Sequence, residues 1–252
     1  MSSPFDLTGR AALVTGASSG IGEAIAIALA NAGADIVAVS RRDPAAARAA
    51  VESAGRKLWH VAADLAGTTA IADAVAQATR HAPHLDILVN NAGTIRRADA
   101  LEVTEADWDA VVDVNLKSAF FLAQAFARTL VARNARGKVI NVASLLSFQG
   151  GIRVAAYTAS KSGLLGITRL LANEWAKLGI NVNAIAPGYV ATANTEALRA
   201  DATRNRAIVE RIPAGRWGEP GDLGGAAVFL ASGASDYVHG AVLPVDGGWL
   251  AR

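Results

Sequence analysis

Several residue types are scarce or missing in this chain of 252 residues, which has no cysteine, one methionine and four histidines. Without cysteine, disulfide bonds, cysteine nucleophiles and thiolate metal sites are excluded. The four histidines are too scattered along the sequence to predict a metal site; they are His60, His81, His84 and His239. A net charge of +2 and the lack of a basic tract argue against nucleic-acid binding.

Long apolar runs are also missing. No uninterrupted run reaches the roughly 18–20 residues that a membrane-spanning helix needs. The first ten residues are polar and lack the apolar core of a signal peptide. We therefore expect no membrane span and a cytoplasmic location.

Hydrophobic residues make up 52% of the chain, and short apolar runs alternate with alanine-rich stretches of helical spacing. The runs predict strands at 11–15, 35–39, 58–62, 87–89, 139–142, 182–185 and 242–245. The stretches predict helices at 22–32, 44–54, 69–81, 105–133 and 155–178. Strict alternation of strand and helix favours one α/β domain, residues 1–252, with a parallel sheet covered by helices on both faces.

Residues 190–218 interrupt this alternation before the last strand. The segment is polar, rich in Arg and Ala, and weakly helical in pattern. An insertion there lies beyond the carboxyl ends of the strands, where open α/β sheets bind ligands. It is either a surface helix pair or a loop that covers the substrate.

A glycine-rich turn, Gly16-Ala-Ser-Ser-Gly20-Ile-Gly22, joins the first predicted strand to the first predicted helix. Glycine lets the backbone turn sharply and approach a pyrophosphate, and a helix start offers free N–H groups. The alternative is a tight strand–helix connection with no ligand. Its place in the first crossover favours dinucleotide binding.

The second strand bears on the choice of dinucleotide. Asp35 opens this strand, so it is not the acid expected to bind a ribose at the strand's carboxyl end. Ser40, Arg41 and Arg42 stand there instead. Serine with arginine suits a 2′-phosphate and slightly favours NADP, whereas arginines on a solvated loop would carry no preference.

Tyr157 and Lys161 are spaced to share one helix face, with Cβ atoms roughly 5–6 Å apart. A tyrosine of ordinary pKa, about 10, is a poor proton carrier at neutral pH. A neighbouring ammonium group favours the phenolate, so we expect Lys161 to lower the pKa of Tyr157. Ser144 lies thirteen residues before the tyrosine. The set predicts acid/base chemistry at a carbinol or carbonyl group.

Together these residues resemble the short-chain dehydrogenase/reductase family. The motifs that carry the resemblance span nearly the whole chain in family order, and they are Thr15-Gly16-x3-Gly20-Ile21-Gly22, Asp64, Asn90-Asn91-Ala92-Gly93, Asn115, Ser144, Tyr157-x3-Lys161 and Pro187-Gly188-x3-Thr192. The resemblance implies a Rossmann-like, doubly wound, seven-stranded sheet. It also implies an NAD- or NADP-dependent oxidoreductase that assembles as a homotetramer.

The resemblance assigns four catalytic roles. Tyr157 would be the general acid/base, and Lys161 would lower its pKa and hold the nicotinamide ribose. Ser144 would donate to the substrate oxygen, and Asn115 would hold a water in a proton relay. Each group also has a structural alternative: Ser144 as a cap, Asn115 at a kinked backbone, Lys161 as a solvated charge.

The resemblance also implies the dinucleotide contacts. They are the turn residues Gly16, Ser18, Ser19, Gly20, Ile21 and Gly22, then Ser40 and Arg41, Asp64 and Leu65, Asn91, Ala92 and Gly93, Tyr157 and Lys161, and Pro187, Gly188, Val190 and Thr192.

Four less general segments, 90–97, 146–154, 212–218 and 245–252, resemble family members that act on deoxy sugar acids. Arginine suits a carboxylate through two parallel hydrogen bonds. Among Arg96, Arg97 and Arg153 we favour Arg153, four residues before Tyr157, and Gln149 and Asn194 could bind sugar hydroxyls. These relatives are associated with NAD, so the choice of cofactor stays open. The alternatives are a gluconate dehydrogenase, a reductase of carrier-bound 3-oxoacyl groups, and a dinucleotide-sensing regulator.

Overall fold

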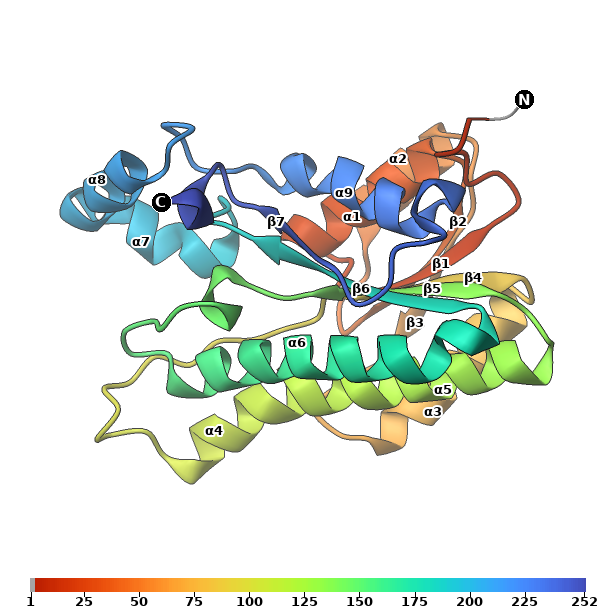
Figure 1. Cartoon of the computed structure of the whole chain (residues 1–252), viewed down its shortest axis with the longest axis horizontal. Helices are drawn as coiled ribbons and strands as arrows, with labels where there is room; N and C mark the ends of the chain where they lie inside the picture. Colours follow the sequence, from red (N-terminus) through yellow and green to blue (C-terminus); the bar gives the residue numbers. More distant parts are fainter. Residues whose placement is uncertain (1–2) are drawn as a thin grey trace.

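The computed structural model describes residues 3–252. Seven strands form one parallel sheet in the order β3-β2-β1-β4-β5-β6-β7 (Figure 1). The strands are β1 (Ala11–Thr15), β2 (Asp35–Ser40), β3 (Leu58–Ala62), β4 (Leu85–Asn90), β5 (Gly137–Val142), β6 (Ile180–Pro187) and β7 (Val242–Val245). Every residue of β1, β2, β5 and β6 is buried. Their near-continuous apolar runs fit a sheet that is covered on both faces.

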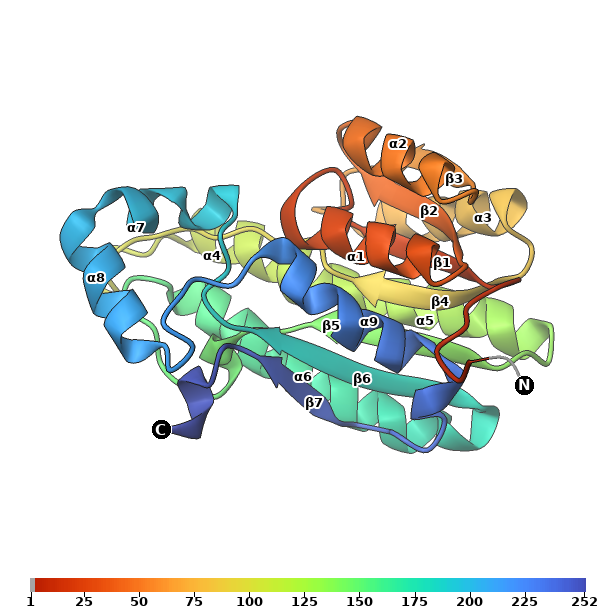
Figure 2. The same cartoon turned by 90° about the horizontal axis from the view of Figure 1, so that it is seen from above.

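Helices cover the two faces of the sheet (Figures 1 and 2). One face packs against α1 (Gly20–Asn31), α2 (Ala45–Ser53) and α9 (Gly224–Ala231). The other packs against α3 (Thr69–His81), α5 (Ser118–Ala132) and α6 (Ala155–Trp175), and α4 (Glu105–Val112) packs on α6. The sheet thus separates two large apolar cores, as expected for a doubly wound fold.

The predicted strands and helices are confirmed, with two differences. The single helix expected at 105–133 contains a π-helical turn at Asp113–Lys117 between α4 and α5. Helix α9 was not predicted, because Gly224-Gly225 at its start is a poor helix former and the remaining residues are apolar on all sides.

The continuous helix Glu105–Ala132 has the length and hydropathy of a membrane span, although 44% of its apolar window is buried within the fold. Its inner residues Leu122, Phe126 and Leu130 are almost inaccessible to solvent and belong to the core beneath the sheet. One side of this helix therefore packs in the core beneath the sheet.

Residues 190–218 leave the sheet at the carboxyl end of β6. They form two short helices, α7 (Glu196–Ala200) and α8 (Ala202–Arg211), which lie beyond the strand ends (Figure 1). Asp201 caps α8 by accepting hydrogen bonds from the N–H groups of Thr203 and Arg204, both at 3.0 Å. The segment rejoins the fold where Val190 bridges to Gly218.

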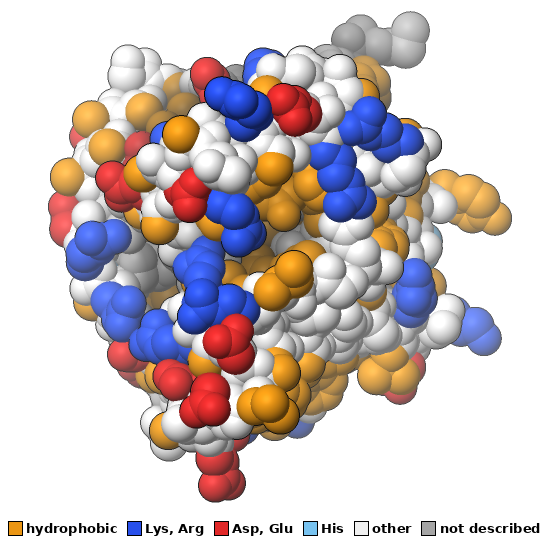
Figure 3. All heavy atoms as spheres, turned by 90° about the vertical axis from the view of Figure 1, so that its left-hand side faces the viewer, with side chains coloured by type: hydrophobic (Ala, Val, Ile, Leu, Met, Phe, Trp, Pro, Cys, Tyr) orange, Lys and Arg blue, Asp and Glu red, His pale blue; other side chains and the backbone are white. Residues whose placement is uncertain are grey.

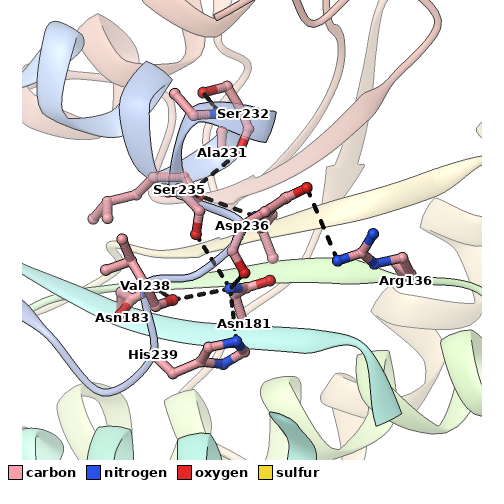
Figure 4. Close-up of polar contacts among 12 residues, drawn as sticks. Arg136, Asn181, Asn183, Ala231, Ser232, Ser235, Asp236, Val238 and His239 are labelled. Carbon is pink, nitrogen blue, oxygen red and sulfur yellow. Dashed lines mark hydrogen bonds and ion pairs between the residues drawn. The ribbon is translucent and has the colours of Figure 1, made fainter. Parts of the chain in front are cut away.

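At the opposite end of β6 from residues 190–218, a polar cluster fixes the connection into β7 (Figure 4). The Asn181 amide of β6 donates to the carbonyls of Asp236 and Val238, at 3.0 and 2.9 Å, and lies 3.1 Å from the His239 ring. The buried Lys138 ammonium lies 2.7 Å from the Asp236 carboxylate, which offsets the cost of burying its charge. These contacts set the register of the edge strand β7 and so the place of the chain end that follows it.

Candidate active site

The glycine-rich turn forms a cradle between β1 and α1. Gly16 and Gly20 adopt left-handed backbone angles, with φ of 68° and 60°. A Cβ on Gly22 would lie 2.3 Å from Asn91 Nδ2 and 2.4 Å from the Gly16 carbonyl oxygen. Ser19 precedes α1, and its side chain does not cap the helix. The first N–H groups of α1 are therefore available to an anion.

Asn91 and Thr15 hold the loops after β4 and β1 together. The Asn91 amide donates to the Thr15 carbonyl at 2.9 Å, and the N–H groups of Asn91 and Ala92 both reach the Thr15 hydroxyl, at 3.0 and 2.9 Å. A Cβ on Gly20 would lie 3.5 Å from the Thr192 methyl group, so the loop after β6 reaches the same cradle. Gly188 is in close contact with Asp246, and Val190 is buried.

The carboxyl end of β2 differs in detail from what the sequence suggests. The Ser40 hydroxyl donates to the Arg42 carbonyl at 2.7 Å, and His60 Nε2 lies 3.0 Å from the Ser40 carbonyl. The serine proton is thus already committed to the turn. Arg41 is exposed and lies 3.9 Å from the Asp64 carboxylate, while Leu65 is buried beside it.

Tyr157 and Lys161 lie on α6, and Ser144 follows β5 directly. The Lys161 ammonium is buried, donates to the Val142 carbonyl at 2.7 Å and lies 5.8 Å from the centre of the Tyr157 ring. It is therefore not a solvated helix charge. Ser144 caps the next turn by accepting from the Leu146 N–H at 3.2 Å. Capping uses a lone pair and leaves the hydroxyl proton free to donate.

Burial moves the pKa values of the tyrosine and the lysine in opposite directions. It raises the pKa of Tyr157, while a hydrogen bond with Ser144 and the charge of Arg97 act to lower it. Burial lowers the pKa of Lys161 to about 8. Both shifts favour the uncharged form, as desolvation does. At Tyr157 desolvation outweighs the interactions that lower the pKa, and the cation among those interactions is Arg97. That Lys161 lowers the pKa of Tyr157 stays a prediction.

Asn115 lies in the π-helical turn and fixes the loop after Gly93. Its side-chain oxygen accepts from the Thr94 N–H at 2.8 Å, and its amide donates to the Thr94 carbonyl at 2.9 Å and to Ser160 at 3.3 Å. The Ser160 hydroxyl in turn donates to the Tyr157 carbonyl at 2.8 Å. Asn115 thus connects the loop after Gly93 to helix α6, in addition to its place in the π-helical turn.

The arginines of the site have different partners. Arg153, in a left-handed conformation with φ of 65°, pairs with Asp99 at 3.1 Å. Arg96 lies 3.6 Å from Asp107. Arg97 donates to the Asn194 carbonyl at 3.1 Å, and no ion pair involves it in residues 3–252. Arg97 therefore has the available charge, which the sequence had led us to expect of Arg153.

The remaining candidates lie on loops around this centre. Gln149 follows the turn that Ser144 caps, with its N–H bonded to the Leu145 carbonyl at 3.2 Å. Asn194 is held against Arg97 by its backbone carbonyl. On the face at this end of the molecule, Lys and Arg side chains gather around a hollow (Figure 3). Within the described part of the chain, no cluster of three His or acidic residues could hold a metal ion.

Comparison with known proteins identifies the family. A family model described as enoyl-(acyl carrier protein) reductase matches residues 16–250. The 2-dehydro-3-deoxy-D-gluconate 5-dehydrogenase of Escherichia coli (strain K12) is 56% identical over 250 residues, covering 99% of each chain. The chain belongs to the short-chain dehydrogenase/reductase family.

Two solved structures are similar throughout. A putative 2-deoxy-D-gluconate 3-dehydrogenase from Agrobacterium tumefaciens, with bound NADP, is 60% identical, with a TM-score of 0.95 and full coverage of both chains. A gluconate 5-dehydrogenase from Burkholderia cenocepacia, in complex with NADP and tartrate, is 40% identical, with a TM-score of 0.94 and coverage of 99% and 98%. The present protein is an NAD(P)-dependent oxidoreductase of this family.

The residues of the site fit a dinucleotide. The left-handed turn at Gly16 and Gly20, the uncapped start of α1 and the exposed Arg41 suit a group that carries several phosphates. Ser144 follows the carboxyl end of β5, and Tyr157 and the buried Lys161 lie on α6. This arrangement can pass a proton to or from a substrate oxygen beside a hydride carrier.

Substitution of Gly22 by alanine tests the cradle. We expect the added methyl group to weaken dinucleotide binding by about tenfold or more, because it collides with Asn91 and the Gly16 carbonyl. Binding is measured by fluorescence titration together with the melting temperature. Gly225→Ala is the matched control, since its Cβ would meet nothing within 4 Å. Equal binding by the Gly22 and Gly225 variants would contradict the assignment.

Proposed function

We propose that this enzyme interconverts a keto and a hydroxy group on a deoxy sugar acid, as a 2-dehydro-3-deoxy-D-gluconate 5-dehydrogenase. The observation that carries the proposal is the placement of Arg97, whose guanidinium donates to the Asn194 carbonyl at 3.1 Å and whose charge acts to lower the pKa of Tyr157. A guanidinium group on this loop can bind the carboxylate of a short substrate. The curated relative at 56% identity supports the same substrate.

The chemistry requires a hydride carrier beside the reacting carbon, and a proton carrier and a hydrogen-bond donor at the substrate oxygen. A bound nicotinamide supplies or accepts the hydride. Tyr157 gives or takes the proton, and Ser144 donates its free hydroxyl proton to the substrate oxygen. Lys161 on α6 donates to the Val142 carbonyl at the end of β5, and Asn115 fixes the loop after β4 through the Thr94 carbonyl. Both contacts support this centre. Pro187 at the end of β6, and Gly188, Val190 and Thr192 on the loop that follows, border it.

The substrate is held by residues on the loops at the strand ends. Arg97 binds the carboxylate, and Gln149 and Asn194 contact hydroxyl groups. Arg153 supports them through Asp99, which fixes the loop that carries Arg97. Residues 190–218 act as the loop that covers the bound substrate within one domain of residues 1–252. Gluconate 5-dehydrogenase is the second candidate, because the Burkholderia relative of that name was solved with the hydroxy acid tartrate.

We also expect a cytoplasmic homotetramer. A groove of about 510 Å³ between α5 and α6, lined by Phe120, Val131, Leu170 and Trp175 among others, leaves apolar surface uncovered. Val131 and Leu170 are 53% and 48% exposed. Long helices with such faces commonly pack against a second copy of the chain.

The pH dependence of the reaction follows from Tyr157. Because burial raises its pKa, the phenolate is a minor form at neutral pH and grows about tenfold per pH unit below that pKa. We therefore expect kcat/KM for alcohol oxidation to rise steadily from about pH 6 to 8, and ketone reduction to stay nearly flat there, since the phenol is the acid. Steady-state rates in both directions check this.

Tyr157→Phe is the matching variant for the pH experiment. It should lose about a thousandfold or more in turnover in both directions and retain dinucleotide binding. An oxidation rate that keeps its pH slope in the phenylalanine variant would assign the titration to another group.

A substrate panel tests the proposed function. We expect the nicotinamide absorbance change to be fastest with 2-dehydro-3-deoxy-D-gluconate, slower with gluconate and slowest with an uncharged acyl ketone. Arg97→Ala should raise KM for the acids by about tenfold to a hundredfold, which corresponds to one lost charged hydrogen bond of about 1.5–3 kcal/mol. Arg153→Ala, whose partner is Asp99, should have a smaller effect. Equal losses for acidic and uncharged ketones would overturn the carboxylate assignment.

We propose NADP as the preferred cofactor, supported by the exposed Arg41 and by the NADP bound in two similar structures. Arg41→Ala should weaken NADPH binding by about tenfold and change NADH binding less than twofold. The control is Arg80→Ala, an exposed arginine at the end of α3. A parallel loss of both cofactors would show that Arg41 does not read the 2′-phosphate.

A further inference from the structure

The chain end after β7 folds into a fixed hook, residues 246–252. The Asp246 carboxylate accepts from the N–H groups of Gly248 and Leu250, at 2.8 and 2.9 Å. Gly247 and Gly248 have φ of 64° and 90°, which glycine adopts without strain. A Cβ on Gly247 would lie 2.9 Å from the Ile212 side chain, and one on Gly248 3.0 Å from Pro213. The two glycines therefore allow the hook to pack closely against the end of α8.

Trp249, at the centre of the hook, is buried with 4% of its surface exposed. It forms a small apolar cluster with Leu145, Ile208 and Ile212. Its ring lies 4.7 Å from that of Tyr189, and the Arg211 guanidinium stands over it at 4.1 Å. Such a cation–π contact contributes stability in addition to burial of the ring.

Two hydrogen bonds to backbone carbonyls join the same two segments. The Ala214 N–H donates to the Gly247 carbonyl at 3.0 Å, and the Arg252 side chain donates to the Glu210 carbonyl at 3.0 Å. The hook is thus connected to α8 and the residues after it on both sides of Trp249 in the chain. Displacement of α8 would require the whole set of contacts to open.

The position of Trp249 matters because its neighbours come from three different segments of the site. Ile208 and Ile212 come from the covering loop, Leu145 directly follows Ser144, and Tyr189 lies between Gly188 and Val190. The cluster is separate from the two large cores on either face of the sheet. Loss of the indole ring should therefore disturb these three segments and leave the rest of the fold in place.

We propose that Trp249 is a positioning residue that holds helix α8 and the Ser144 turn in the geometry required to bind the sugar acid. The inference rests on the proposed function, since it assigns the covering loop to that substrate. It predicts that the chain end acts mainly on the KM for the sugar acid and far less on dinucleotide affinity, because only the Tyr189 segment of the cluster borders the dinucleotide and the phosphate cradle lies on a different loop.

The indole N–H helps to separate packing from hydrogen bonding. Although buried, Trp249 Nε1 has no hydrogen-bond partner within residues 3–252. Phenylalanine keeps a ring between Tyr189 and Arg211 and removes this unpaired donor, so it should retain the positioning role. Alanine removes the ring and leaves the cluster open.

The experiment compares Trp249→Ala, Trp249→Phe and the control Trp59→Ala, whose ring packs at the distant strand β3. For Trp249→Ala we expect KM for the sugar acid to rise about tenfold or more and kcat to fall, with dinucleotide affinity within twofold of the parent. Trp249→Phe should recover most of this loss. Limited trypsin digestion should cleave α8, at Arg204 and Arg206, faster in the alanine variant alone.

Two results would overturn the proposal. One is an alanine variant with KM, kcat and trypsin sensitivity unchanged; the other is a parallel loss of dinucleotide binding, which would indicate general unfolding. Should the alanine variant not fold, Arg211→Gln is the second test, and it should raise KM and trypsin sensitivity in the same direction. If the parent enzyme turns over no sugar acid, the proposed function fails, while the trypsin comparison still decides the role of Trp249.

Discussion

The parallel direction of all seven strands is the constraint on which the site depends. Because parallel strands end at the same edge, every loop that follows a strand is delivered to one side of the molecule. The glycine turn follows β1, and Ser40 is the last residue of β2. Asn91 comes after β4, Ser144 after β5, and Gly188 after β6. Hydrogen bonds from Asn91 to Thr15 then fix the spacing between two of these loops. Chemistry that is dispersed over most of the chain thus becomes one site.

Burial controls the electrostatics of that site. It raises the pKa of Tyr157 and lowers the pKa of Lys161 to about 8, so both groups are drawn towards their neutral forms. The interactions that oppose this at the tyrosine come from Ser144 and Arg97, on two other loops. Under the proposed function, the Arg97 guanidinium would support the phenolate and bind the substrate carboxylate, which would connect substrate binding to proton transfer.

Much of the fold was predictable, because buried parallel strands leave apolar runs that are easy to recognise. Helix α9 was missed because its two glycines and its uniformly apolar residues match no amphipathic pattern. The motif residues were found from their spacing, but Arg153 was favoured over Arg97 on its distance along the chain from Tyr157. Only the fold shows that Asp99 pairs with Arg153, and that the Ser40 proton is already donated to Arg42.

The sequence by itself determined the order of strands and helices along the chain, and it predicted the phosphate-binding turn and the roles of Tyr157 and Lys161. These depend on residues close together in the chain, or on patterns of period and spacing. The tertiary structure alone decided the direction of the two pKa shifts, the arginine whose charge acts on Tyr157 and the contact of Trp249 with the Ser144 turn. Those properties depend on desolvation and on distances between segments far apart in the sequence, and local patterns contain no information about either.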